Sequence, residues 1–258
     1  MFNISADRYT DAGDRKETNQ DSVLCRTDVS GGRAFGMFIV ADGCGGLAYG
    51  GEISGLAVTH MSRIWDTELR SVLAKHEGND DVICSFLEET IQDLNKMAVG
   101  FSRRTGDKTG TTLSLLLINK DRWYIKNTGD SRVYLIRKGR AERLTEDQSL
   151  MADMLRNNEL TLEQVESFKE TNVLTMCVGY FDEVKTFTRT GRLKARDSFL
   201  LCSDGLYNHL PEGIFDGLLK RFPGVTAAEL CQSIPKGGAM DNVSAILVHV
   251  GKKSRWFG

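Results

Sequence analysis

Residues 111–144 place the strongest constraint on the fold. This stretch, TTLSLLLINKDRWYIKNTGDSRVYLIRKGRAERL, contains three or four short runs of apolar or alternating residues. Asn-Lys-Asp, Thr-Gly-Asp and Lys-Gly-Arg separate the runs, and such clusters are typical of tight turns. Because strands joined by tight turns pair antiparallel, the stretch predicts an antiparallel meander.

Three further strands adjoin an aspartate. FGMFIVADG (35–43) and SFLLCSDG (198–205) are apolar runs that end in an acid and a glycine, and NVSAILVHV (242–250) follows Asp241. The apolar content of these runs indicates buried strands. The sequence therefore predicts strands with carboxylates beside their ends.

Apolar residues recur at helical spacing in segments 52–74 and 80–101, which we expect to pair as an antiparallel hairpin. Shorter helices are expected at 147–157, 161–168, 211–221 and 226–234, with Thr161 and Thr226 as N-caps and Pro211 in a first turn. Because the strands cluster apart from the long helices, we predict an α+β fold with antiparallel sheets rather than a doubly wound parallel sheet.

Composition limits the classes of protein that the chain represents. With 258 residues, three prolines and no linker-like stretch, we expect one domain over 1–250, followed by a basic tail at 251–258. A formal charge of −2 argues against nucleic acid as a partner. No apolar run is long enough to span a membrane, and the start lacks the layout of a signal peptide. Six cysteines without a C-x-x-C pair predict reduced thiols, so we expect a cytoplasmic protein.

Four acids recur in similar settings: Asp21 in TNQDSV, Asp42 in VADGCGG, Asp204 in CSDGLY and Asp241 in MDNVS. Carboxylates that converge in one cleft repel each other and need a countercharge, which a hard divalent cation with oxygen ligands supplies. The acids therefore predict bound Mg²⁺ or Mn²⁺.

The glycines after Asp42 have two interpretations. Gly43 has no Cβ, so its carbonyl oxygen can approach a metal ion closely, while Gly45 and Gly46 would keep the approach open for substrate. The alternative is a plain turn from strand to helix with a capping acid.

Eight motifs in order resemble the metal-dependent protein phosphatases, the protein phosphatase 2C (PPM) family, in its short bacterial form. The resemblance covers nearly the whole chain through TDAGDRKETNQDS, VADGCGG, TGTTL, NTGDSRVYLIRKG, LTEDQSLMADMLRNNELTLEQ, NVLTMCVG, LLCSDGLYNHL and DNVSAILV. It implies a sandwich of two antiparallel sheets flanked by helices on both sides, with a metal cluster at one end. It also implies removal of phosphate from Ser and Thr side chains of proteins, by a monomer that opposes a bacterial Ser/Thr kinase.

The resemblance also assigns roles to residues of this chain. The resemblance implies that Asp42 bridges two metal ions and that the Gly43 carbonyl oxygen binds the second ion. It implies that Asp21 contacts metal-bound water. Asp204 and Asp241 would hold the first ion, and Asp130 would join Asp204 around a third. Segment 148–180 would be the flap beside the cleft, although TLEQVESF within it also reads as a plain surface helix.

Two ions about 3.5–4 Å apart lower the pKa of a bridging water, so that hydroxide attacks the phosphoryl group in line near neutral pH. No protein nucleophile is then required. A cysteine-based route would need an arginine six residues after the cysteine, and none of the six cysteines has one.

Three positions depart from the commonest family pattern. Gln20 stands where many members have Glu, which makes one water-mediated contact neutral. The phosphate-binding cation aligns with Lys16, yet the neighbouring Arg15 would offer a bidentate contact, so both are candidates. Cys44 occupies the position of a histidine proposed as general acid in animal members; it either fills that position inertly or forms an oxidation-sensitive site.

The sequence also bears on two other classes of function. A non-catalytic pseudophosphatase that binds phosphorylated partners would be marked by loss of ligand acids, whereas Asp42, Asp204 and Asp241 are all present. A calcium-binding module would need a D-x-D-x-D-G loop, which the sequence lacks.

Overall fold

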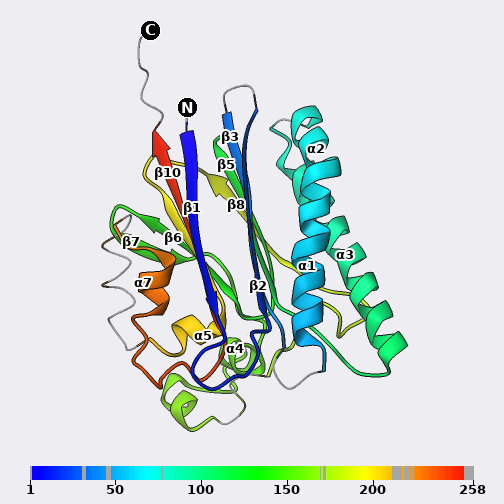
Figure 1. Ribbon diagram of the computed structural model, residues 1–258, viewed down its shortest axis with the longest axis vertical. Helices are drawn as coiled ribbons and strands as arrows, with labels where there is room; N and C mark the ends of the chain where they lie inside the picture. Colours follow the sequence, from blue (N-terminus) through cyan, green and yellow to red (C-terminus); the bar gives the residue numbers. More distant parts are fainter. Residues whose placement is uncertain are drawn as a thin grey trace.

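Two antiparallel sheets stacked face to face form the centre of the computed structural model (Figure 1). The structure describes residues 2–30, 33–44, 48–76, 78–168, 170, 173–210, 217, 221 and 224–252. Within these residues one sheet has the order β1-β10-β9-β6-β7 and the other β2-β3-β4-β5-β8. The strands are β1 Phe2–Asp11, β2 Asp21–Ser30, β3 Arg33–Asp42, β4 Leu113–Asn119, β5 Arg122–Thr128, β6 Arg132–Arg137, β7 Arg140–Arg143, β8 Phe187–Arg192, β9 Ser198–Cys202 and β10 Val243–Lys252.

Helices cover the outer faces of both sheets, which confirms the predicted fold class (Figure 1). The two long helices, α1 and α3, lie side by side over the sheet that contains β3, while α5 and α7 pack on the sheet that contains β10. The helices are α1 Gly50–Ile64, a π-helix Trp65–Leu69, α2 Arg70–Lys75, α3 Asp80–Thr105, α4 Leu150–Arg156, a 3₁₀ helix Leu162–Ser167, α5 Asp204–Tyr207 and α7 Ala227–Cys231.

Successive side chains of the apolar strand β3 belong alternately to two hydrophobic cores. Met37 and Ile39 face α1 and α3, whereas Phe38 and Val40 pack between the two sheets against residues of β9 and β10. Successive side chains of a strand point to opposite faces, so a strand buried on both faces is apolar throughout. This explains why FIVA carries no polar position.

The meander of 111–144 is present but is divided between the sheets. β4 and β5 belong to one sheet, and after the turn at 129–131 the chain continues as β6 and β7 in the other. Tight turns predict which strands follow one another, but they do not specify which sheet each strand joins. The turn that crosses between the sheets contains Asp130.

Most predicted helices are confirmed, with shifts at their ends. Segment 52–74 becomes α1, the π-helix and α2 in continuous succession, and 161–168 is a 3₁₀ helix. Thr161 and Thr226 are the N-caps of their helices, as predicted, and each also forms a capping box, although α7 ends at Cys231. The predicted helix 211–221 lies almost entirely outside the described residues, as does Pro211.

Three strands and one boundary were not predicted. β1, β2 and β8 were not predicted because they are rich in Thr, Asp and Arg, which obscure the alternation of apolar and polar side chains typical of a strand. β10 continues to Lys252, into the segment predicted as a tail, and 253–258 lies outside the described residues. None of the described helices combines the length and the apolar content that crossing a membrane requires.

Candidate active site

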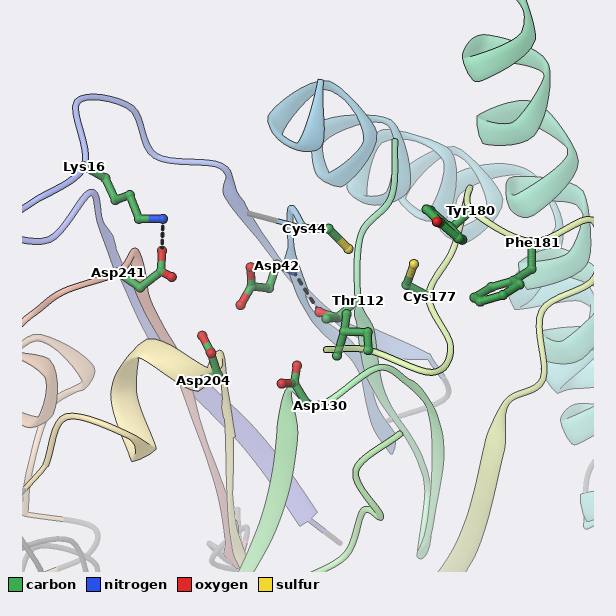
Figure 2. Close-up of a pocket in the computed structure, with 11 residues that line it drawn as sticks. Lys16, Asp42, Cys44, Thr112, Asp130, Cys177, Tyr180, Phe181, Asp204 and Asp241 are labelled. Carbon is green, nitrogen blue, oxygen red and sulfur yellow. Dashed lines mark hydrogen bonds and ion pairs between the residues drawn. The ribbon is translucent and has the colours of Figure 1, made fainter. Parts of the chain in front are cut away.

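Aspartates from four separate segments line one cavity of about 380 Å³ at the end of the sandwich opposite the chain termini (Figures 1 and 2). They come from the end of β3, the turn between β5 and β6, the start of α5 and the residue two before β10. The described residues that line the cavity are Lys16, Asp42, Cys44, Thr112, Asp130, Leu174, Cys177, Tyr180, Phe181, Asp204 and Asp241. The structure thus brings together four of the predicted acids.

Asp21 lies behind this cavity rather than on its wall. β2 pairs with β3 in a register that places Asp21 opposite Asp42. Ser203 Oγ donates to Asp21 Oδ2 at 2.9 Å, whereas Oδ1 is buried without a hydrogen-bond partner. A buried carboxylate oxygen without a partner is costly. It therefore provides an acceptor for a further donor.

Gly43 is required by close packing of the backbone. A Cβ on this residue would lie 2.5 Å from the carbonyl carbon of Gly50 and 2.7 Å from the carbonyl oxygen of Gln20. The Gly43 N–H also donates to that Gln20 oxygen at 3.2 Å. The glycine is needed where β2, β3 and the start of α1 meet, which is a reason that the sequence did not reveal. Gly45 and Gly46 lie outside the described residues.

Asn242 supports Asp241, as its position suggests. Its backbone N–H donates to Asp241 Oδ1 at 2.8 Å, and its side-chain amide donates to the carbonyl oxygens of Ala12 and Thr18. Its Oδ1 accepts from the N–H of Gln20 at 2.9 Å. One side chain thereby joins the loop before β2 to the start of β10.

Burial and mutual repulsion raise the pKa of these carboxyl groups. For Asp42 the pKa rises well above its ordinary value, because of burial first and then the charges of Asp21 and Asp204. The pKa of Asp130 is raised to about 8 by burial and by Asp204 and Asp147, and that of Asp21 to about 6, mainly by burial. The pKa of Asp204 is raised as well, by burial and by Asp241. The residues of the cavity therefore supply too little positive charge to keep all of these carboxyl groups ionised near neutral pH.

Lys16 is the cation on the described wall of the cavity. Its Nζ lies 3.1 Å from Asp241 Oδ1, and Figure 2 shows the side chain directed toward that carboxylate. Arg15 is exposed and does not line the cavity. Of the two candidate phosphate ligands, Lys16 is the one that the structure brings to the acids.

The donor set suits a hard divalent cation that retains water. Among the described residues, no three Asp, Glu, His or Cys side chains form a ready-made ligand set around one point. Mg²⁺ typically takes one or two carboxylates and keeps several waters. The shared cavity, the excess of carboxylates and the unpartnered oxygen of Asp21 are compatible with such ions.

A second cavity adjoins the first. Asp130, Asp204 and Asp241 line both, and Asp147 and Asn208 are on the wall of the second. Asp147 accepts hydrogen bonds from the Arg132 guanidinium, which lies 3.5 Å above the Tyr207 ring. Asp130 and Asp204 therefore face a second common space, which Lys16 does not line.

The apolar wall of the cavity was not predicted residue by residue. Leu174, Cys177, Tyr180 and Phe181 form it, at the end of the segment predicted as a flap and just beyond it. Residues 169 and 171–172 of that segment lie outside the described residues. Nothing in NVLTMCVGYF distinguishes a cavity wall from a core segment, so tertiary contacts were needed to identify it.

Comparison with known proteins agrees with the fold and the site. The family model for protein phosphatase 2C matches residues 11–233. The serine/threonine phosphatase stp of Listeria welshimeri is 34% identical over 82% of this chain and 83% of its own length. The protein phosphatase PhpP of Streptococcus pneumoniae is 31% identical over 95% of this chain and 96% of its own length.

Solved structures show the same fold. Stp1 of Staphylococcus aureus superposes with a TM-score of 0.84 at 23% identity, over 95% of this chain and 94% of that one. The catalytic domain of the serine/threonine protein phosphatase PstP, solved in complex with two manganese ions, gives 0.79 at 25% identity over 98% of this chain and 100% of that one.

A double antiparallel sandwich with an acidic cavity at one end defines the class of metal-dependent phosphatases. The chain belongs to the protein phosphatase 2C family, in its short bacterial form, and is a metal-dependent serine/threonine protein phosphatase.

Proposed function

We propose that two divalent cations bind at the acidic cavity and that phosphoserine and phosphothreonine side chains of proteins are hydrolysed there. Asp42 is proposed to bridge the ions, with Asp204 and Asp241 on the first and the Gly43 carbonyl on the second. Asp130 and Asp204, which share the second cavity, are proposed to hold a third. The observation that supports the proposal best is the set of four carboxylates, one buried and three half-buried, that line one cavity, with Lys16 as the described cation.

When bound, the cations supply an activated water for in-line attack and neutralise the phosphoryl oxygens. The residues of the chain perform the other tasks. Asp21, behind Asp42, accepts from Ser203 and leaves one oxygen for a further donor. Lys16 is proposed to bind and orient the phosphate of the substrate. Cys44 has no proton-transfer role in this scheme.

Mg²⁺ and Mn²⁺ are both proposed as cofactors. Carboxylate and carbonyl oxygens suit either ion, and the structural relative PstP was solved with two manganese ions. Phosphatase activity measured against the concentration of each ion, after bound metal has been removed with EDTA, shows which ion supports the higher activity.

The proposed partners are phosphorylated proteins, including a bacterial Ser/Thr kinase and its targets. We further propose a monomer whose single catalytic domain spans 1–250, with 148–180 as a flap beside the cleft. The six cysteines are free thiols in the structure, which supports a reducing compartment such as the cytoplasm.

Hydrolysis of a phosphothreonine peptide tests the assignment. Turnover should require Mn²⁺ or Mg²⁺ and stop with EDTA, and Asp42→Asn should lower kcat/KM by about 100-fold or more, because the ions supply several kcal/mol of transition-state stabilisation. Asp107→Asn, which removes an exposed acid after α3, is the matched control. Full turnover by Asp42→Asn, or turnover that survives EDTA, would contradict the assignment.

A further inference from the structure

The catalytic cavity has two chemically different ends. Figure 2 shows Lys16 and Asp241 on one side of it and Tyr180 and Phe181 on the other, with Asp42 between them, and all five residues line the same cavity. The proposed hydrolysis uses the acidic end and leaves the apolar wall without a task. The apolar wall is therefore available to bind another part of the substrate.

The distance between the two ends is set by three extended segments that lie side by side. Gly43, which follows Asp42, is paired with Thr111, and Thr111 is paired in turn with Val178. Neighbouring extended segments lie about 4.8 Å apart, so the backbone of the apolar wall is about 10 Å from that of the catalytic segment. An extended peptide advances about 3.3–3.6 Å per residue and covers this distance in about three residues.

Two thiols line the cavity between its ends. Cys44 and Cys177 lie between Asp42 and Tyr180 in Figure 2, and both are free cysteines. A Cβ on Gly110 would lie 2.9 Å from Cys177 Sγ and 3.3 Å from Cys44 Sγ, so the sulfur atoms fill the space beside this glycine. A free cysteine behaves as a small hydrophobic residue. The surface from the acids to the aromatic rings therefore becomes steadily less polar.

The aromatic pair of the wall is held in place although it is accessible. The Tyr180 and Phe181 rings meet edge to face, with centroids 5.0 Å apart and an angle of 63° between their planes. Lys108 Nζ donates to the Tyr180 hydroxyl at 2.9 Å and lies 4.4 Å from the centroid of its ring. Tyr180 is nevertheless 39% exposed. An ordered aromatic surface loses little conformational entropy when it binds a side chain.

We propose that the apolar wall is a specificity subsite that binds an apolar side chain of the protein substrate, within about three residues of the phosphorylated Ser or Thr. Tyr180 and Phe181 are the main contacts. The acids and Lys16 act on the phosphate, whereas the apolar wall selects among phosphorylated sequences. This inference rests on the proposed function and adds the class of sequence that the site prefers.

The chemistry of the wall favours an apolar side chain over a charged one. The four side chains of the wall are uncharged, so a charged residue would lose hydration there without gaining an ion pair. An acidic residue would in addition be repelled by the aspartates of the same cavity. An aliphatic or aromatic side chain gains free energy by leaving water for the surface of the rings.

A set of phosphothreonine peptides tests the preference. The reference peptide has glycine at the three positions on either side of the phosphothreonine, and leucine is then placed at each of these positions in turn. We expect leucine at one position or more to raise kcat/KM at least about tenfold, which is the size of effect that apolar contacts in a pocket produce. Lysine at the same position should give no gain. Equal kcat/KM for all the peptides would overturn the proposal.

Variants of the wall assign the preference to the rings. Tyr180→Ala should lower the ratio of kcat/KM between the best leucine peptide and the glycine peptide at least about fivefold, because an aromatic face is lost from the contact. Tyr180→Phe, which retains the ring, should keep the ratio. Met97→Ala is the matched control, since it removes an exposed apolar side chain of α3 that does not line the cavity. An unchanged ratio in Tyr180→Ala would overturn the role of this ring.

Peptide binding provides a readout that does not depend on turnover. The same leucine and glycine peptides, with a non-hydrolysable phosphonate in place of the phosphate, are compared by fluorescence anisotropy, and the leucine form should bind more tightly to the wild type than to Tyr180→Ala. Failure of the proposed hydrolysis is thus distinguishable from failure of the subsite. Equal affinity for the two peptides would overturn the subsite. Dissociation of a dimer in Tyr180→Ala with an intact leucine preference would show that a second copy of the chain covers the wall, and would also overturn it.

Discussion

At the scale of single residues, the backbone fixes Asp42 before any ion binds. Its N–H donates to Thr112 Oγ1 at 3.0 Å, and its carbonyl oxygen accepts from Thr111 Oγ1 at 2.9 Å and from the Thr112 N–H at 2.8 Å. Preorganised ligands lose less conformational entropy on binding. The TGTTL motif therefore contributes to the site through two hydroxyl groups, although neither coordinates an ion in the proposal.

Lys16→Ala is expected to lower kcat/KM for a phosphopeptide by about tenfold, because a charge-assisted hydrogen bond to phosphate contributes about 1.5–3 kcal/mol and this side chain is partly exposed. Steady-state kinetics of Lys16→Ala and Arg15→Ala at saturating Mn²⁺ make the comparison. A larger loss in Arg15→Ala would show that the neighbouring guanidinium binds the phosphate.

Gly43→Ala is expected to destabilise the fold by about 1–3 kcal/mol, because the new Cβ collides with the backbone of Gly50 and Gln20. Urea unfolding of the metal-free protein measures this cost apart from any effect on metal binding. Gly55→Ala in α1 is the control, since a Cβ there meets nothing within 4 Å. Equal midpoints for the two variants would contradict the packing argument.

At the scale of elements, α3 positions the apolar wall of the cavity. Asn95 is fully buried on this helix, and its Nδ2 donates to the carbonyl oxygens of Phe181 and Asp182 at 2.9 and 3.2 Å. Its Oδ1 accepts from the Gly179 N–H at 2.8 Å. The amide of Asn95 thus forms hydrogen bonds with three backbone groups. Through them α3 holds the wall segment in position beside the catalytic acids.

Asn95→Ala is expected to cost about 2–3 kcal/mol of unfolding free energy, because it leaves buried backbone groups unpaired, and to raise KM more than it lowers kcat. Thermal unfolding and peptide kinetics measure the two effects. Thr90→Val, also on α3, loses a buried hydroxyl that bonds only within its own helix, to the Phe86 carbonyl, and should leave KM unchanged. A wild-type KM in Asn95→Ala would disprove the positioning role.

At the scale of the whole molecule, the fold gathers carboxyl groups at one end. The pKa of Asp21 is raised to about 6 and that of Asp130 to about 8, so the folded protein binds protons more tightly than the unfolded chain. The unfolding free energy of the metal-free protein should therefore fall as pH rises from about 4 to about 8. Divalent cations counteract this loss by replacing the protons.

The rise in Tm caused by Mn²⁺ should consequently be larger at pH 8 than at pH 5, by several degrees for a protein of this size. Differential scanning calorimetry with and without Mn²⁺ at both pH values measures it. Asp130→Asn should reduce the difference between the two pH values, because one titrating group is gone. A rise in Tm that does not depend on pH would contradict the charge argument.

Prediction from sequence succeeded where information is local. The N-caps Thr161 and Thr226, the two long helices and the strands rich in Val, Ile and Leu follow from neighbours in the chain. β1 and β8 were missed, since polar edge strands carry little periodic signal. Asp42, Asp204 and Asp241 were identified from their positions beside apolar strands and Asp130 through the family resemblance, and the structure brings all four to one cavity.

The sequence alone determined the class of fold, the family and the set of acids, because strand alternation, helix caps and ordered motifs are encoded over short stretches. Only the tertiary structure decided that the chain crosses between the sheets at Asp130, that Lys16 rather than Arg15 reaches the acids, and that Cys44 meets Cys177 across Gly110. These contacts join segments remote in the chain. Their geometry depends on the packing of whole sheets, which no local pattern specifies.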